Sequence, residues 1–263
     1  MLKSLYTTAT GMKAQQTMVD TIANNIANVN TAGFKRSQVT FEDLLYLTVQ
    51  APGLRVDASG SYSPIGLQIG SGSRVSGTTK IYTPGVLEGS ANNLDVAIEG
   101  DGFFQVLLPD GSVGFTRDGQ FSINADGRLV TSTGYVLTPE VTLTPDVAEL
   151  SIDQEGRVTI STQGNPTPTQ VAQLQLAKFI NPAGLLSAGG NIVTETAASG
   201  APIVGQPGAN GLGTLKQGFI ERSNVEIVNE LVSLIVAQRA YEVNSRAIQT
   251  SDQMLSTATS IVR

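Results

Sequence analysis

The feature that most constrains the fold is a heptad repeat in the C-terminal part of the chain. An apolar side chain recurs there at every seventh position: Ile227, Leu234, Tyr241, Ile248, Leu255 and Val262. The interleaved positions are mostly polar: Leu231, Gln238, Ser245, Asp252 and Thr259. This spacing is typical of a helix that packs along a narrow seam. Because Ser223 and Glu226 have the spacing of a capping box, we predict a helix from about 224 to 262.

The N-terminal segment carries a similar pattern over residues 2–28. One set of seam positions consists of Leu5, Met12, Val19 and Ile26, and the interleaved set consists of Leu2, Ala9, Gln16 and Ala23. Gly11 is the weak point of this predicted helix, and Asn28, Asn30 and Gly33 supply its stop signals. Narrow seams of this kind indicate helices that contact several neighbouring molecules. The alternative is that both helices simply cover a β-domain.

Between the ends, from about residue 75 to residue 216, the pattern changes to short alternating runs separated by turns. Residues 103–108 read as a buried strand, and Asp-Gly pairs follow at 110–111, 118–119 and 126–127. Eight or more short strands at this spacing predict an antiparallel β-domain.

A segment rich in Gly, Ser and Pro, residues 46–74, precedes the β-domain. Pro52, Gly53, Gly60 and Pro64 argue against a helix here. Its apolar content exceeds what a solvated linker needs, so we favour an extended arm that docks on neighbours. The apolar residues are Leu47, Val49, Leu54, Val56, Ile65, Leu67 and Ile69.

Composition excludes several functions. The formal net charge of −6 disfavours binding to nucleic acid, which requires a basic surface. The chain has no His and no Cys, which rules out His- and Cys-based catalytic arrangements and the usual zinc sites. The first residues lack the apolar run of a cleaved signal peptide, and no stretch of about 18 apolar residues predicts a membrane span. We expect no cofactor, no metal and no enzymatic activity.

One enzymatic function is compatible with this composition. A pair of carboxylates could hydrolyse a glycoside, and Asp95, Glu99 and Asp101 are the candidates. The competing interpretation is that these side chains are solvated at turns and strand edges. In the same way, Arg117 and Asp118 read as a turn pair or a surface contact.

Three motifs, in order along the chain, resemble the rod and hook proteins of the bacterial flagellum. Residues 24–36 (NNIANVNTAGFKR) resemble the N-terminal signature of that family, and residues 237–245 (AQRAYEVNS) and 250–255 resemble its C-terminal signature. Residues 100–106 (GDGFFQV) and 115–119 resemble the start of its β-domain. The motif residues singled out are Asn24, Asn25, Asn28, Gly33, Phe34, Lys35, Gln238, Arg239 and Tyr241.

Within the family, residues 41–46 and 66–70 are similar to the arm of distal rod members. The resemblance implies a subunit of a rigid hollow helical tube that transmits torque from the motor to the hook. It also implies export through the flagellar apparatus and a location in the periplasmic rod. The implied partners are copies of itself, proximal rod and hook subunits, and the periplasmic and outer-membrane rings. A proximal rod or hook subunit is the alternative, and a peptidoglycan hydrolase is a remote one.

Together these observations predict an α+β chain. Long N- and C-terminal helices form a coiled-coil-like domain, next to a central antiparallel β-domain and an extended arm. The expected divisions are an assembly helix at 1–33, a connector and arm at 34–74, the β-domain at 75–216, and a second assembly helix at 217–263 that pairs with the first.

Overall fold

The computed structural model describes residues 2–53, 65–143, 147–162 and 165–261, and it divides the chain into two compact units. Unit 1 contains residues 1–26, 37–79 and 227–263, and unit 2 contains residues 27–36 and 80–226. The division differs from the sequence expectation because residues 27–36 belong with the β-rich unit, and residues 37–79 belong with the two helices.

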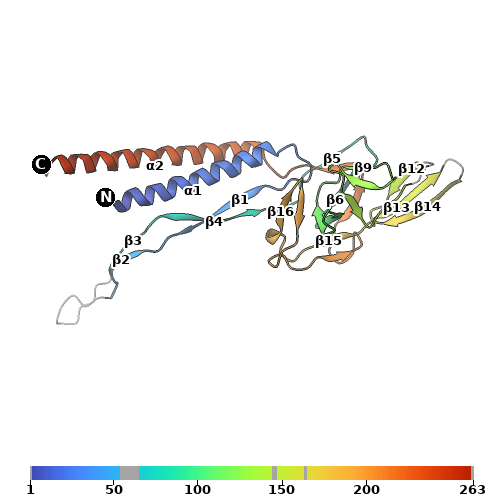
Figure 1. The fold of residues 1–263 in the computed structure, drawn as a ribbon, viewed down its shortest axis with the longest axis horizontal. Coiled ribbons are helices and arrows are strands. Elements are labelled where there is room, and N and C mark those ends of the chain that lie inside the picture. The colour runs from blue at the N-terminus through green and yellow to red at the C-terminus, as the bar shows by residue number, and fades with distance from the viewer. Residues whose placement is uncertain (1, 54–64, 144–146, 163–164, 262–263) are drawn as a thin grey trace. The chain divides into compact units, whose positions relative to one another are not determined.

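Two long helices and two strand pairs make up unit 1 (Figure 1). The helices are α1 (Leu2–Ala27) and α2 (Ile227–Ile261), close to the predicted ranges. The strands are β1 (Ser37–Asp43), β2 (Leu47–Gln50), β3 (Leu67–Ile69) and β4 (Ser73–Lys80, whose last residue falls in unit 2). β1 pairs with β4, and β2 pairs with β3 in antiparallel register. The segment 46–74, predicted to be an extended arm, therefore contains the paired strands β2 and β3, while its residues 54–64 lie outside the described part.

The capping box predicted at the start of α2 is not where the helix begins. The helix starts at Ile227, three residues later than expected. Ser223 Oγ instead accepts a hydrogen bond from the Val225 amide at 3.3 Å, and the Asn224 side chain binds other segments of unit 2. The Asn224 side chain thus takes part in tertiary hydrogen bonds just before the helix begins.

The helices of unit 1 approach closely at small residues. A Cβ atom on Gly11 would lie 3.2 Å from Nδ2 of Asn244 on α2, which is a tight contact. Ala14 on α1 and Ala237 on α2 are buried, as is Ile22. Gly11, which weakens the helix locally, therefore permits close packing of α1 on α2.

Unit 2 is built from antiparallel strands, as predicted, around one main core. Its largest sheet has nine strands in the order β16-β17-β8-β7-β11-β10-β9, with β15 joining β7 to β18. A three-stranded sheet β12-β13-β14 and the pairs β19-β6 and β20-β5 complete it. The bounds are β5 (Leu87–Gly89), β6 (Val96–Glu99), β7 (Phe103–Leu107), β8 (Val113–Thr116), β9 (Phe121–Ile123), β10 (Leu129–Thr131), β11 (Val136–Thr138), β12 (Val147–Ile152), β13 (Arg157–Thr162), β14 (Asn165–Gln173), β15 (Leu176–Lys178), β16 (Leu186–Gly189), β17 (Ile192–Thr194), β18 (Ile203–Gly205), β19 (Thr214–Gln217) and β20 (Phe219–Glu221). A 3₁₀ turn, η1 (Pro182–Gly184), precedes β16.

The turn signals in the sequence correspond to real connections. Asp110-Gly111 links β7 to β8, and Asp126-Gly127 links β9 to β10. The glycine takes a positive φ in both pairs, 81° for Gly111 and 76° for Gly127. The strands between these turns bury the main core, in which Phe104 and Phe121 meet edge to face at 5.1 Å between ring centroids.

Candidate functional site: a buried charge cluster and an exposed helix face

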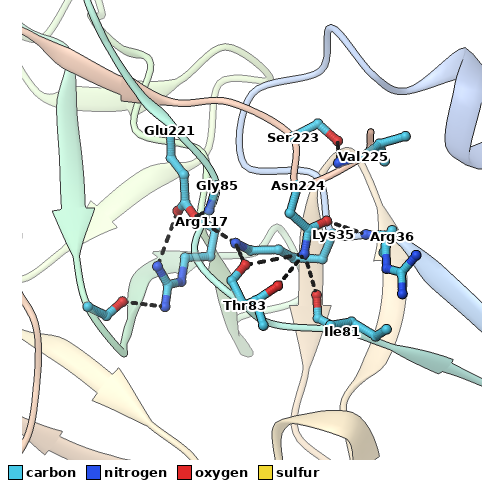
Figure 2. Close-up of polar contacts among 11 residues, drawn as sticks. Lys35, Arg36, Ile81, Thr83, Gly85, Arg117, Glu221, Ser223, Asn224 and Val225 are labelled. Carbon is cyan, nitrogen blue, oxygen red and sulfur yellow. Dashed lines mark hydrogen bonds and ion pairs between the residues drawn. The ribbon is translucent and has the colours of Figure 1, made fainter. Parts of the chain in front are cut away.

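The N-terminal motif ends in a segment of unit 2 that is bonded to a buried carboxylate. Glu221, the last residue of β20, accepts from Lys35 Nζ at 2.6 Å and from Arg117 Nη1 at 3.1 Å (Figure 2). The Gly85 amide donates to the same carboxylate at 2.8 Å. All three charged side chains are at most 3% exposed. We call Lys35, Arg117 and Glu221 the charge cluster.

Further hydrogen bonds join the chain segments around the charge cluster. The Gly33 amide donates to the Glu221 carbonyl at 2.8 Å, and Lys35 Nζ also donates to the Thr83 carbonyl at 2.8 Å. The Asn224 side chain accepts from the Arg36 amide and donates to the carbonyls of Ile81 and Thr83 (Figure 2). The segment that follows α1 and the segment that precedes α2 are thus held to one strand region of unit 2.

Burial sets the protonation behaviour of this region. Loss of solvation lowers the pKa of Lys35, and the neighbouring Glu221 carboxylate opposes that shift. Burial raises the pKa of Asp118, although hydrogen bonds from the Gln120 amide and from Asn191 oppose it. Since an unpaired buried charge is costly, the paired arrangement of Lys35 and Arg117 on one carboxylate is what makes their burial possible.

Sequence reasoning misjudged part of this cluster. The sequence predicts that Arg117 and Asp118 form a turn pair or a surface contact, but the two residues are only 5% and 8% exposed. A surface contact is wrong, because a turn signal does not reveal whether the turn lies inside the molecule. The Asp118 carboxylate does accept a hydrogen bond from the Gln120 amide, as in an Asx turn. Glu221 belongs to no motif that would predict a role for it from the sequence, whereas Lys35 is singled out only as part of the family motif.

The candidate carboxylates do not gather at one site. Asp95 is buried and accepts hydrogen bonds from Ser90 and Asn92, so the expectation that it is solvated was wrong. Glu99 is exposed, and Asp101 is exposed and pairs with Lys178 at 2.9 Å. Of the three, Glu99 lines the polar cavity of about 710 Å³ beside β12, β13 and β19, and the other two do not.

The predicted seam residues occupy intermediate positions in unit 1. Leu5, Met12, Val19 and Ile26 on α1 and Leu234, Ile248 and Leu255 on α2 are half-buried, whereas Ile227 and Tyr241 are 47% and 40% exposed. The interleaved residues Ala9, Gln16 and Ala23 are exposed, as are Leu231, Gln238, Asp252 and Thr259. The second covered row of α2 instead runs one position earlier, through Glu230, Ala237, Asn244, Ser251 and Ala258.

The motif residues fall into two groups. Gly33 and Lys35 are buried, and Asn25 is buried in unit 1, where its side chain bonds both backbone groups of Ser37 and reaches Glu230 Oε2 at 3.4 Å. Asn28 and Phe34 are half-buried. By contrast, Asn24, Gln238, Arg239 and Tyr241 are exposed. The buried group serves packing within the chain, whereas the exposed group lies at the surface, where Arg239 pairs with Glu242 at 3.5 Å.

The side of α2 opposite its covered rows carries an exposed apolar stripe. Its members lie in the first half of the helix and are 44–73% exposed: Val228, Leu231, Val232, Ile235 and Val236. The same side of the second half is mainly polar, with Arg246, Gln249 and Gln253. Large exposed apolar patches are typical of interaction sites. Neither helix of the described residues is long and apolar enough to cross a membrane.

An amphipathic helix pair with an uncovered apolar stripe, joined to an antiparallel β unit, defines a structural subunit built for assembly. Three family descriptions match this chain: "Flagella basal body rod protein" at residues 5–35, "Flagellar hook protein FlgE/F/G D1 domain" at 97–160, and "Flagellar basal body rod FlgEFG protein C-terminal" at 216–261. The chain therefore belongs to the flagellar basal-body rod protein family.

Full-length relatives support this assignment. The chain is 46% identical to the flagellar basal-body rod protein FlgG of Borreliella burgdorferi over 100% of both chains. It is 44% identical to FlgG of Caulobacter vibrioides, again over 100% of both, and 40% identical to FlgG of Bacillus subtilis over 97% of both.

Gly33 offers a direct test of how tightly the motif is held. Its φ is +67°, and an added Cβ would lie 2.6 Å from the carbonyl carbon of Arg117. We expect Gly33→Ala to lower the free energy of unfolding by about 2–4 kcal/mol, because strain at positive φ adds to a clash with rigid backbone.

Gly111→Ala is the matched control for the cost of placing alanine at a positive φ. Gly111 also has a positive φ, +81°, but nothing lies within 4 Å of the added Cβ. Urea unfolding of both variants separates the two effects. Equal losses of stability in the two variants would show that the close approach at Gly33 contributes nothing.

Proposed function

We propose that this protein is the structural subunit of the flagellar distal rod and that it polymerises into a rigid hollow helical tube. The observation that carries the proposal is the similarity to FlgG proteins over the whole chain, at 40–48% identity. The exposed apolar stripe of α2 supports it, because such a face is stabilised when a neighbouring subunit covers it. The half-buried seam residues then hold each subunit's own helices, and the stripe joins subunits.

The charge cluster has a mechanical role in this proposal. A subunit of a drive shaft must pass force between its helices and its β unit through the segments that connect them. The chain passes between the two units at four points, and residues 33–36 and 221–224 of unit 2 lie next to two of them. These two segments are bonded to each other and to residues 81–85. This bonding supports the transmission of torque from the motor to the hook.

The partners follow from the position in the rod. They are copies of this chain, proximal rod and hook subunits at the two ends of the tube, and the periplasmic and outer-membrane rings around it. The subunit reaches the periplasmic rod through the flagellar export apparatus. A catalytic role is not proposed, since the chain has no His or Cys and its three candidate carboxylates do not line one cavity.

Electron microscopy of polymers grown from the purified chain tests the proposal. We expect straight tubes. Curved filaments would favour the alternative of a hook subunit, and a chain that stays monomeric at rising concentration in light scattering would contradict the proposal. A zymogram with peptidoglycan tests the remote hydrolase alternative, and we expect no cleared band.

The segment 46–66 is proposed to stiffen the tube. The flanks of this arm present exposed apolar side chains, among them Leu47, Val49 and Leu67, which a neighbouring subunit can cover. Deletion of 46–66 leaves α1 and α2 intact, so we expect polymers that still form but are more curved in electron micrographs. Straight polymers of unchanged stiffness would make the arm a passive linker.

A further inference from the structure

A small cavity beside the charge cluster is lined by apolar side chains and by several hydrogen-bond donors. Its volume is about 30 Å³, and its lining includes Lys35, Lys80, Tyr82 and Arg117 but no Asp or Glu. All of these residues belong to unit 2. A cavity of this size has room for one water molecule or one ion of similar volume.

Two of the lining groups have donors that no described residue accepts. Arg117 is 5% exposed, and its Nη1 and Nη2 are bonded to Glu221 and to the Gly100 carbonyl, but its Nε has no acceptor among the described residues. The buried hydroxyl of Tyr82 likewise has no partner in the described part of the chain. An unpaired buried donor costs about 1–3 kcal/mol, so a group that accepts from both would stabilise the fold.

The charge balance around the cavity is positive. Lys35, Lys80 and Arg117 line it, and the nearby Glu221 carboxylate is already shared between Lys35, Arg117 and the Gly85 amide. Lys80 lies over the Phe34 ring at 5.9 Å and has no acidic partner among the described residues. Burial lowers the pKa of Lys80 and raises the pKa of Tyr82 to about 12, as expected for groups that lack solvent and a compensating partner.

The carboxylate of the neighbouring Asp118 does not line the cavity. Asp118 accepts from the Gln120 amide at 3.0 Å and from Asn191 Nδ2 at 3.4 Å. It is not among the residues that line the cavity. The lining therefore offers donors and an excess of positive charge, because one carboxylate, Glu221, is shared between Lys35 and Arg117.

We propose that this cavity binds a small monovalent anion of the halide class, chloride in solution, held by the Arg117 Nε–H and the Tyr82 hydroxyl next to the Lys80 ammonium. A neutral water molecule would accept from the same donors but would leave the excess positive charge of the lining uncompensated. The anion supplies the missing acceptor and the missing charge together, and so it stabilises unit 2 around the charge cluster.

The test measures the melting temperature of the full chain in sodium chloride, sodium bromide and sodium gluconate at one ionic strength. Gluconate is too large for the cavity. We expect chloride and bromide to raise the melting temperature by about 2–4 °C over gluconate when the halide is well above its dissociation constant. Equal melting temperatures in all three salts would overturn the proposal and leave water as the occupant.

Two variants locate the effect. Tyr82→Phe removes one donor and keeps the ring, so it is expected to lose most of the halide-dependent rise. Tyr135→Phe is the matched control, because Tyr135 packs against the main core away from this cavity's lining, and it should keep the rise in full. A rise that persists unchanged in Tyr82→Phe would place the halide effect elsewhere and overturn the proposal.

A direct readout comes from the line width of the chloride NMR signal during titration of the protein. We expect broadening with the parent chain and with Tyr135→Phe, and little with Tyr82→Phe or with a second variant, Lys80→Met. Circular dichroism confirms that each variant is folded before it is compared. Identical broadening in all four proteins would also overturn the proposal.

Discussion

Glu221→Gln is expected to destabilise unit 2 by about 3–5 kcal/mol. The substitution keeps the size of the side chain but removes the one carboxylate that pairs with Lys35 and Arg117, both at most 3% exposed. Breaking a buried ion pair from one side leaves an uncompensated charge in a medium that solvates it poorly, and this accounts for the magnitude. Urea unfolding followed by circular dichroism measures the loss.

Glu88→Gln is the matched control for this experiment. Glu88 lies on β5, the strand paired with β20, and it forms an ion pair with Arg222 in which the two side chains are 47% and 53% exposed. Because solvent screens exposed pairs, we expect a loss below about 1 kcal/mol. If Glu221→Gln were as mild as Glu88→Gln, the charge cluster would not be a stabilising element of the fold.

The second prediction with a large effect concerns the assembly of subunits and not the stability of the monomer. Val232 and Ile235 lie in the apolar stripe of α2, and each is 56% exposed in the subunit. The double substitution Val232→Asp with Ile235→Asp leaves the melting temperature of the monomer nearly unchanged, because little burial is lost within the chain. In a polymer it removes two apolar contacts of about 1.5–3 kcal/mol each and introduces charge at the interface.

The measurement is the lowest concentration at which polymers form. Two lost contacts of that size raise it by a factor of roughly 10²–10⁴, so no tubes are expected at the concentration that suffices for the parent chain. Gln253→Asp, on the same side of α2 but beyond the stripe, is the control and should polymerise normally. Tubes from the double variant at the parental concentration would show that the stripe is not an assembly surface.

The sequence by itself determined the kinds of elements and their order. A repeat of seven is a local property, and it was enough to predict α1 and α2. Alternation and Asp-Gly turns were likewise enough for an antiparallel β unit, since both act over a few residues. The terminal motifs were sufficient for the family, because they combine specific residues in a fixed order.

Only the tertiary structure decided which side chains meet. The second covered row of α2 contains Glu230, Ala237 and Asn244, and small or polar residues carry no hydrophobic signal by which they could be found. Lys35, Arg117 and Glu221 lie far apart in the chain, and local patterns hold no information about pairs separated in this way. Their charges read as surface charges until the fold encloses them, because a buried carboxylate becomes stable only when its partners are brought to it.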